Sequence, residues 1–310
     1  MIDLVIKSYK PSLKDNSLKI YLTSLRVLND GNDIKNIEFL KDYDKIIEKL
    51  SKKKDNTKKN YLNAIIIALK ALKSDEKLIK RYEELRDKYQ KQYQDLTASH
   101  TKTSTQEKNW VDWDEYLKMV DELGDLVKDL KSKKEWDNED LVNYQNYLVP
   151  LLYKHYAIRN DWHDMEVLKQ REFKKRDDKE NFLVVGTSSK STKYKFVLNN
   201  FKTSAKYKQI SIPVESKELQ RAIDLFLKHN KSGYFIISPK RPDEPISGNE
   251  LTKLLIGLSV KHLDGRRVGS SLIRHIYLSH KYGETLKESE KDAQIMGHST
   301  DQQKHYVKTG

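Results

Sequence analysis

Apolar side chains with helical spacing dominate the first third of the chain. They recur every three or four positions through residues 18–28, and the turn residues 29–31 end that run. A second pattern occupies residues 37–50, and a charged helix is expected at about 75–94. Between them lies the clearest apolar stripe of the region: Tyr61, Leu62, Ile65, Ile66, Leu69 and Leu72. The pattern predicts a bundle of short helices.

The hydrophobic period stops in a polar, Ser/Thr-rich segment that begins near Leu96 and ends near Thr105. It restarts at Trp110, where apolar positions again follow helical spacing. The sequence therefore predicts a helical domain over residues 1–98, a linker over 99–109 and a second domain over 110–310.

The second domain begins with helices and then changes to the two-residue period of strands. Residues 182–185, 194–201 and 209–214 read as strands, and the polar turn 204–208 joins the last two. Helical patterns resume at about Lys217 and continue to the end. The expected fold class is mainly α with a small antiparallel β-sheet.

Charge points to a polyanionic partner. In 310 residues, 59 Lys and Arg face 46 Asp and Glu, which gives a formal charge of +13. Such a surplus favours nucleic acid, because each phosphate that a Lys or Arg neutralises releases condensed counterions. An acidic membrane surface is the rival partner, but no strongly apolar amphipathic stretch lies beside a basic one. Lys58, Lys59 and Lys70 lie near the apolar stripe of residues 61–72, and they are candidates to face DNA or they form a solvated helix face.

Several classes of protein are excluded by what the sequence lacks. Without cysteine there is no disulfide scaffold, no thiolate catalysis and no cysteine-based zinc site. The N-terminus lacks the apolar segment and cleavage site of a signal peptide. No run approaches the roughly 20 apolar residues of a membrane-spanning helix.

Two basic residues stand where a side chain can leave the core. Arg159 ends an apolar helical run and is followed by Asp161 and Asp164, so an ordinary ion pair is one interpretation. Lys202 lies where a strand meets its turn, and we expect it to project from the tip of the hairpin. Taken alone, it is typical of a lysine that protects a sheet edge.

Two further stretches lie near the end of the chain. Residues 269–278 place Arg274 within a helix, and Gly297 after an apolar run predicts a helix stop. His298 is then expected at a helix end, where a lone histidine is usually a surface residue. Taken alone, Tyr306 is typical of a packing residue.

The order of these residues resembles the signature of the tyrosine recombinases. Leu272-Ile273-Arg274-His275 resembles the family's second arginine box, and Ile295-Met296-Gly297-His298-Ser299 followed by Tyr306 resembles its Leu-Gly-His-Ser … Tyr ending. Arg159-Asn160-Asp161 resembles the first arginine box of recombinases from viruses and mobile elements. The resemblance spans residues 159–306. The first hundred residues resemble the family's helical core-binding domain only in position, length and Lys-rich character.

The resemblance implies an activity and a role for each residue. Arg159 and Arg274 would clamp the scissile phosphate, and Tyr306 would attack it to give a 3′-phosphotyrosyl intermediate. Lys202 would protonate the leaving 5′ oxygen, and His298 would hydrogen-bond the phosphate. This chemistry requires no metal, no cofactor and no ATP. The implied architecture is a helical core-binding domain followed by a mixed α/β tyrosine-recombinase catalytic domain.

The sequence departs from the family pattern at two places. The family usually has a histidine three positions before the second arginine, where this chain has Ser271. Serine can donate a hydrogen bond but is a poor base, and His275 points about 100° away on a helix. The chain also ends soon after Tyr306, whereas family members often pass a C-terminal segment to a neighbouring subunit.

The resemblance favours a site-specific DNA recombinase or integrase of a virus or mobile element. Expected partners are double-stranded DNA and three further copies in a homotetramer, with no membrane association. We expect an intracellular location, wherever the target DNA lies: host nucleus, cytoplasm or viral factory. A type IB topoisomerase or telomere resolvase uses similar residues and is the alternative within this chemistry. A DNA-binding protein without catalytic activity is the alternative from another class, and Ser271 is the residue that suggests it.

Overall fold

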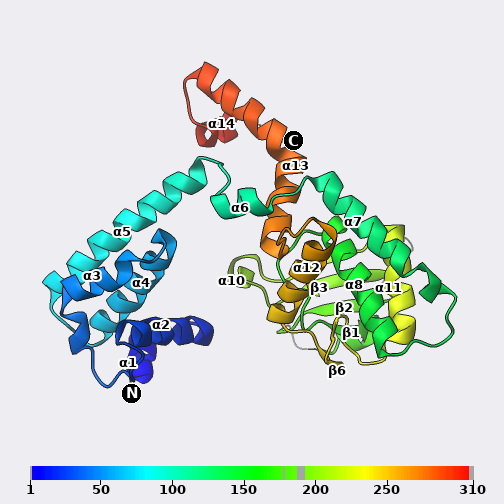
Figure 1. The fold of residues 1–310 in the computed structure, drawn as a ribbon, viewed down its shortest axis with the longest axis horizontal. Coiled ribbons are helices and arrows are strands. Elements are labelled where there is room, and N and C mark those ends of the chain that lie inside the picture. The colour runs from blue at the N-terminus through cyan, green and yellow to red at the C-terminus, as the bar shows by residue number, and fades with distance from the viewer. Residues whose placement is uncertain (1, 177–178, 187–192, 307–310) are drawn as a thin grey trace. The chain divides into compact units, whose positions relative to one another are not determined.

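The computed structural model describes residues 2–176, 179–186 and 193–306. The chain divides into two compact units, Met1–Lys102 and Thr103–Gly310 (Figure 1). The boundary falls within the segment 99–109 that the sequence predicts as a linker.

Unit 1 is helical throughout its described part. Its elements are α1 (Ile2–Tyr9), α2 (Asp15–Leu28), the short 3-10 helix η1 (Glu38–Leu40), α3 (Tyr43–Ser51), α4 (Asp55–Ala71) and α5 (Glu76–Ala98).

Helix α4 is the centre of unit 1. Leu62, Ile65 and Leu69 of its apolar stripe are fully inaccessible, and α1, α2 and α5 all pack against the helix. The expectation that Leu72 belongs to the buried stripe is wrong, because the helix ends at Ala71 and Leu72 is 41% exposed. The predicted stop after α2 is confirmed, because the helix ends at Leu28 and Gly31 adopts a positive φ of 84°. Helix α5 runs past the predicted end of the charged helix, to Ala98.

Unit 2 contains the remaining helices and all the strands of the described chain. The helices are α6 (Ser104–Asn109), α7 (Trp113–Leu126), the 3-10 helix η2 (Lys128–Lys131), α8 (Asn138–His155), α9 (Gln170–Phe173), α10 (Ser204–Tyr207), α11 (Lys217–His229), α12 (Gly248–His262), α13 (Ser270–Met296) and α14 (Thr300–Tyr306). The strands are β1 (Glu166–Lys169), β2 (Phe182–Val185), β3 (Tyr194–Leu198), β4 (Ile210–Pro213), β5 (Ile237–Ser238) and β6 (Arg241–Pro245).

The main sheet has four strands in the order β1-β2-β3-β4. The strand predicted at 182–185 is confirmed as β2, and β3 and β4 form the core of the predicted hairpin, with α10 in their connection. The expectation of a purely antiparallel sheet is wrong, because β1 pairs in parallel with β2 and makes the sheet mixed. A second, two-stranded antiparallel sheet joins β5 to β6.

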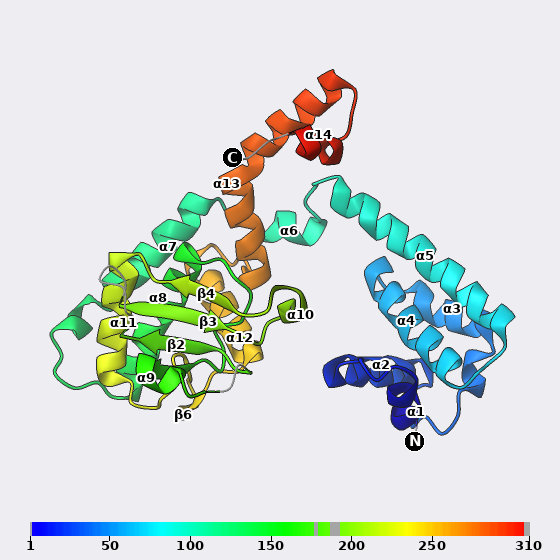
Figure 2. The ribbon, with the colours of Figure 1, turned by 180° about the vertical axis from the view of Figure 1, so that it is seen from behind.

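The two faces of the main sheet bury different clusters. Leu183, Phe196 and Leu198 belong to the large core that also contains residues of α7, α8, α11, α12 and α13. Phe182, Val184 and Val197 face the other way and pack with Leu168 and Phe173. Figure 2 shows the strands from the side on which the sheet is open to view.

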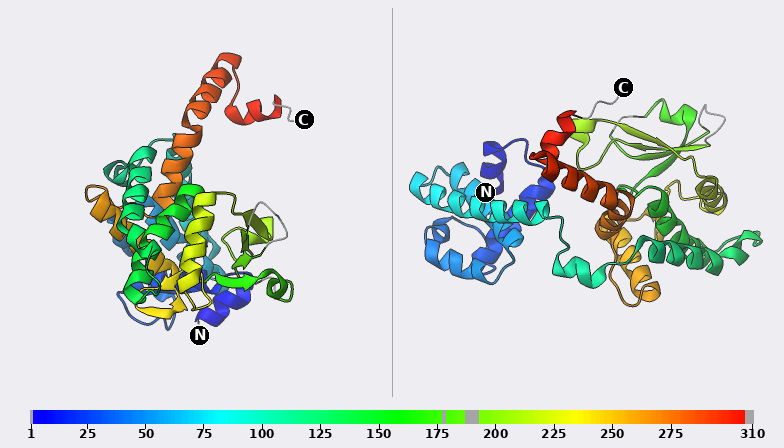
Figure 3. Two further views of the ribbon diagram at one scale, coloured as in Figure 1. Left: turned by 90° about the vertical axis from the view of Figure 1, so that its right-hand side faces the viewer. Right: turned by 90° about the horizontal axis from the view of Figure 1, so that it is seen from above.

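Helix α13 is the longest element, with 27 residues. Its first turns bury Ile273 and Ile276 in the large core, and the helix then leaves the rest of unit 2 and carries α14 at its far end (Figure 3). The predicted stop is confirmed: the helix ends at Met296, and Gly297 adopts a left-handed conformation with φ of 70°. No helix in the described residues is long and apolar enough to cross a membrane.

Candidate functional site

Two arginines that are far apart in the sequence are neighbours in unit 2. Arg159 lies in the loop that follows α8, and Arg274 lies in the second turn of α13. Both side chains are half-buried. Burial and the nearby charge of Arg159 together lower the pKa of the Arg274 guanidinium. The fold therefore brings together the two arginines that the sequence singles out, which we call the arginine pair.

The arginine pair is not neutralised by a direct ion pair. Neither guanidinium has a hydrogen bond or salt bridge to any residue in the described part of the chain, and the Nε atom of Arg274 is buried without a partner there. Buried donors are almost always satisfied, and two like charges repel each other. An anion bound between the guanidiniums would satisfy both requirements.

Asp161 is an acidic residue whose carboxyl interacts electrostatically with both members of the arginine pair. Burial raises the pKa of its carboxyl, while the charges of Arg159, His163 and Arg274 act in the opposite direction. Asp164 instead contacts His163, with 3.0 Å between Oδ1 and Nδ1. The simple interpretation of Arg159 as a partner of Asp161 or Asp164 in an ordinary ion pair is therefore wrong.

A hydrogen-bonded framework holds the Arg159 loop. The buried hydroxyl of Tyr153 shares its one proton between two acceptors, the Arg159 carbonyl oxygen at 3.3 Å and Asn160 Oδ1 at 3.2 Å. Asn160 Nδ2 in turn donates to the Gly248 carbonyl oxygen at 3.0 Å and to Thr252 Oγ1 at 2.6 Å, both on α12. The loop is thus fixed to two helices.

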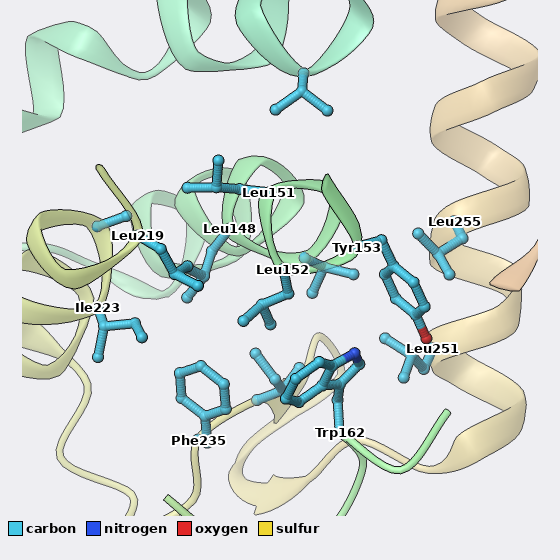
Figure 4. Packing of buried hydrophobic residues seen from close by; sticks show 14 of the residues in the cluster. Leu148, Leu151, Leu152, Tyr153, Trp162, Leu219, Ile223, Phe235, Leu251 and Leu255 are labelled. Atoms are coloured by element: carbon cyan, nitrogen blue, oxygen red, sulfur yellow. The ribbon is translucent and has the colours of Figure 1, made fainter. Parts of the chain in front are cut away.

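The framework rests on the large core. Figure 4 shows the Tyr153 ring beside Leu251 and Leu255 of α12, with the indole of Trp162 next to it. Ser270, at the start of α13, lies close enough to the Tyr153 phenol to lower its pKa, but burial has the larger effect and raises that pKa. The phenol therefore stays protonated and links the Arg159 loop to the helix that carries Arg274.

Lys202 lies in the connection between β3 and β4, two residues before α10. Its side chain is exposed, and the neighbouring Phe201 is buried in the large core. Ser271 is exposed in the first turn of α13, three positions before Arg274 and therefore on the same side of the helix.

The remaining two candidate residues lie at the other end of α13. The rings of His298 and Tyr306 are stacked, with centroids 5.5 Å apart and an interplanar angle of 26°. His298 Nδ1 is 3.1 Å from the Ser299 carbonyl oxygen, and the side chain of Tyr306 is 65% exposed. We call α14 and the part of α13 from Leu278 onward the C-terminal arm.

The arm does not bring His298 and Tyr306 to the arginine pair of the same chain. Met296 follows Arg274 by about 22 positions in one continuous helix, which corresponds to about 33 Å at 1.5 Å per residue. The structure thus forms two half-sites: the arginine pair near the start of α13, and the His298–Tyr306 pair beyond its end.

Unit 1 presents a separate basic surface on α4 and α5. The ammonium groups of Lys58 and Lys59, on α4, lie over the rings of Tyr89 and Tyr93, on α5, at 5.0 and 4.4 Å from the ring centroids. Lys70, the third lysine considered from the sequence, instead contacts Glu83 at 2.7 Å. Lys58 also contacts an acidic residue, Asp55, at 2.8 Å. Lys59 is therefore the better candidate for a phosphate contact.

Reasoning from the sequence missed the residues that support the site. Tyr153 and Asn160 lie within or beside the first arginine box, but nothing in the spacing indicates what their side chains bond. Asn181, described below, stands directly before a strand and has no motif around it. These residues act through contacts with backbone that is distant in the sequence.

Comparison with protein-family models, with curated proteins and with solved structures finds no match for this chain. Within residues 2–176, 179–186 and 193–306, no cluster of three or more His, Asp or Glu side chains is arranged to hold a metal ion.

Proposed function

We propose that this protein cuts and rejoins duplex DNA through a covalent phosphotyrosyl intermediate, as a site-specific recombinase or integrase. The observation that carries the proposal is the arginine pair: two neighbouring guanidiniums with no direct partner among the described residues and one buried, unsatisfied Nε. Such an arrangement is costly for a protein unless an anion binds there. A phosphodiester is the anion that suits a chain with a net charge of +13.

Arginine suits this task because of its shape. The planar guanidinium presents several N–H donors in a fixed fork that matches two oxygens of one phosphate. Negative charge grows on the non-bridging oxygens as a nucleophile attacks phosphorus. Tyr153 and Asn160 hold the backbone of the Arg159 loop in place, which limits the reorganisation needed before the Arg159 guanidinium can stabilise that charge.

The proposed reaction exchanges one phosphoester bond for another. The phenolic oxygen of Tyr306 bonds to phosphorus, the bond from phosphorus to the 5′ oxygen breaks, and the phenolic proton passes to solvent. Lys202 donates a proton to the departing 5′ oxygen. His298 hydrogen-bonds the phosphate. Reversal with a new 5′ hydroxyl rejoins the DNA, so the bond energy is conserved and no ATP is consumed.

The two half-sites must meet for this reaction. Either α13 bends, so that Tyr306 reaches the arginine pair of its own chain, or the arm of a second copy supplies the tyrosine. Strand exchange between two duplexes requires four copies in either arrangement. Lys59 of unit 1 provides a further phosphate contact that does not depend on the arm.

The test begins by finding a DNA sequence that the full chain binds. Selection from a random duplex pool supplies it, and the bound sequences are then synthesised with a nick that releases a short fragment after cleavage and traps the covalent product. Wild-type protein and Tyr306→Phe are compared on a denaturing gel. Tyr282→Phe is the matched control, because Tyr282, on α13, is another exposed tyrosine of the C-terminal arm.

We expect a shifted protein–DNA band with wild type and Tyr282→Phe and none with Tyr306→Phe. Binding without any covalent band across the selected duplexes would overturn the proposal and favour a DNA-binding protein without catalytic activity. If the adduct forms, joining of two selected duplexes distinguishes a recombinase from a topoisomerase, which would only relax supercoiled DNA.

A further inference from the structure

Asn181 makes an unusual set of hydrogen bonds at the centre of unit 2. Its side chain is 3% exposed and lies directly before β2. The Oδ1 atom accepts from the backbone N–H groups of Asn199 and Asn200, each at 2.9 Å. The Nδ2 atom donates to the carbonyl oxygens of Asn200 at 3.0 Å and Asp161 at 3.3 Å. One amide therefore ties the Arg159 loop to the β3–β4 connection.

The segment held by Asn181 is the one that carries Lys202, and we call residues 199–203 the lysine loop. Phe201 anchors the loop in the large core next to the lysine, and Ser204 N–H donates to the Phe201 carbonyl oxygen at 3.1 Å. On the solvent side, Gln209 Nε2 donates to Asn199 Oδ1 at 2.8 Å. The backbone of Lys202 is thus fixed although its side chain is exposed.

The geometry points to Asn181 as a positioning residue that sets Lys202 relative to the arginine pair; this inference rests on the proposed function. A general acid must lie within hydrogen-bond reach of the leaving oxygen while the arginines hold the same phosphate. Asn181 bonds the backbone of both segments concerned: Asp161 in the Arg159 loop, and Asn200 in the lysine loop. All of these bonds are to backbone of this chain and the Asn181 side chain is buried, so Asn181 acts through Lys202.

The test uses the leaving group to separate this role from a general structural one. In a duplex with sulfur in place of the scissile 5′ oxygen, the leaving group is a thiolate, which needs no proton near neutral pH because thiols have a pKa of about 8.5. A variant that only displaces Lys202 should be slow on the oxygen duplex and close to wild type on the sulfur duplex.

Asn181→Asp keeps the volume and the Oδ1 acceptor but removes both donor bonds and places an acceptor beside two carbonyl oxygens. We expect it to lower the single-turnover rate of adduct formation about 10- to 100-fold on the oxygen duplex, because small displacements of a catalytic group have effects of this size. On the sulfur duplex we expect a rate within about twofold of wild type, as for Lys202→Ala. Arg274→Met should stay slow on both duplexes.

Two further variants keep the result interpretable. Gln209→Ala loosens the lysine loop from its exposed side, so it tests the same loop if Asn181→Asp does not fold; we expect a smaller loss with the same rescue by sulfur. Asn230→Asp is the matched control, because Asn230 is a buried asparagine in another turn, where it bonds Tyr234 and Ser232. It should leave both rates unchanged.

The possible outcomes separate the two claims. If wild type gives the Tyr306 adduct but the Asn181→Asp and Gln209→Ala defects are equal on both duplexes, the positioning role is overturned while the proposed function stands. The same holds if neither variant is slower than wild type. If wild type forms no adduct on either duplex, both claims fall together.

Discussion

The two ends of α13 differ in which side chains they bury and which they expose. Over its first turns the helix buries Ile273 and Ile276, each at most 2% exposed, and places Arg274 half-buried beside another arginine. Beyond residue 277 the usual relation is reversed, because large apolar side chains face solvent: Leu278, Tyr282, Leu286, Ile295 and Met296. One end buries charge and the other exposes apolar surface.

Stability alone favours neither the half-buried charge at one end nor the exposed apolar side chains at the other. A binding partner would correct each of them. An anion would satisfy the arginine pair. A protein surface would cover the apolar face of the arm, because patches of this kind mark interaction sites. Under the proposed function, the start of α13 would bind DNA phosphate and its end would pack on another protein surface. Four measurements test that contrast.

The largest expected effect concerns the arginine pair. Arg274→Met removes the charge and keeps most of the apolar volume. Its adduct rate should fall by about 10²- to 10³-fold, the usual loss when one donor to a developing oxyanion is removed. Thermal stability should stay equal or rise, because a half-buried charge that repels Arg159 is gone. A loss of rate together with a lower melting temperature would contradict this and assign Arg274 a structural role.

Packing at the two ends should differ by several kcal/mol. Ile276→Ala should lower the free energy of unfolding by about 2–5 kcal/mol, because it leaves a cavity in the large core. Leu278→Ala, two positions later, should change it by about 0.5 kcal/mol or less, since that side chain is 50% exposed. Tryptophan fluorescence reports on unit 2 alone, because Trp110, Trp113, Trp136 and Trp162 all belong to it. Equal losses would mean that the arm packs on this protein in solution.

Gly283 lies between the two ends of α13. Its substitution tests whether the helix bends there to bring the two half-sites together. An added Cβ would meet no atom within 4 Å, so alanine fits and stabilises the straight helix by about 1 kcal/mol. If α13 must bend there for Tyr306 to reach its own arginine pair, Gly283→Ala slows adduct formation by up to about fivefold, which is the result we expect. Gly257→Ala, the same change at an open position of α12, is the control.

An unchanged rate for Gly283→Ala would instead favour an arm supplied by a second copy. In that case, a mixture of Arg274→Met and Tyr306→Phe proteins should form adduct although neither does so efficiently alone. In the bending arrangement the mixture stays nearly inactive, because no chain carries both half-sites intact.

Features of the fold that a few neighbouring residues determine could be predicted from the sequence, whereas features that depend on distant contacts could not. The stops after Leu28 and Met296 are marked by Gly31 and Gly297, whose positive φ angles suit glycine, and β2 was predicted at its observed residues. The parallel pairing of β1 with β2 was missed, because no local pattern specifies which edge of a sheet an added strand joins. The helix α10 within the hairpin connection was missed for a related reason, since four residues are too few to show a period.

The candidate site likewise has residues that the sequence could indicate and contacts that it could not. Residue order was enough to single out Arg159, Arg274 and Tyr306, because the proposed chemistry demands those side chains. It could not indicate that the arginines are neighbours without a direct partner, which depends on the packing of α8 against α12 and of α13 against α7. Nor could it indicate Asn181, whose bonds reach backbone at positions 161, 199 and 200.

The smallest expected effect measures the anion site directly, without DNA. Sulfate is a tetrahedral oxyanion like a phosphate group, and a ligand at a concentration equal to its dissociation constant stabilises a protein by about 0.4 kcal/mol. That corresponds to a rise of about 1 °C in the unfolding temperature of unit 2, followed by tryptophan fluorescence. Chloride at matched ionic strength is the control for general salt effects. The rise should be absent in Arg274→Met and present in Tyr306→Phe, because the two residues lie in different half-sites. An equal rise in all three proteins would mean that sulfate binds elsewhere. The claim that the arginine pair at the start of α13 binds an anion would then fail.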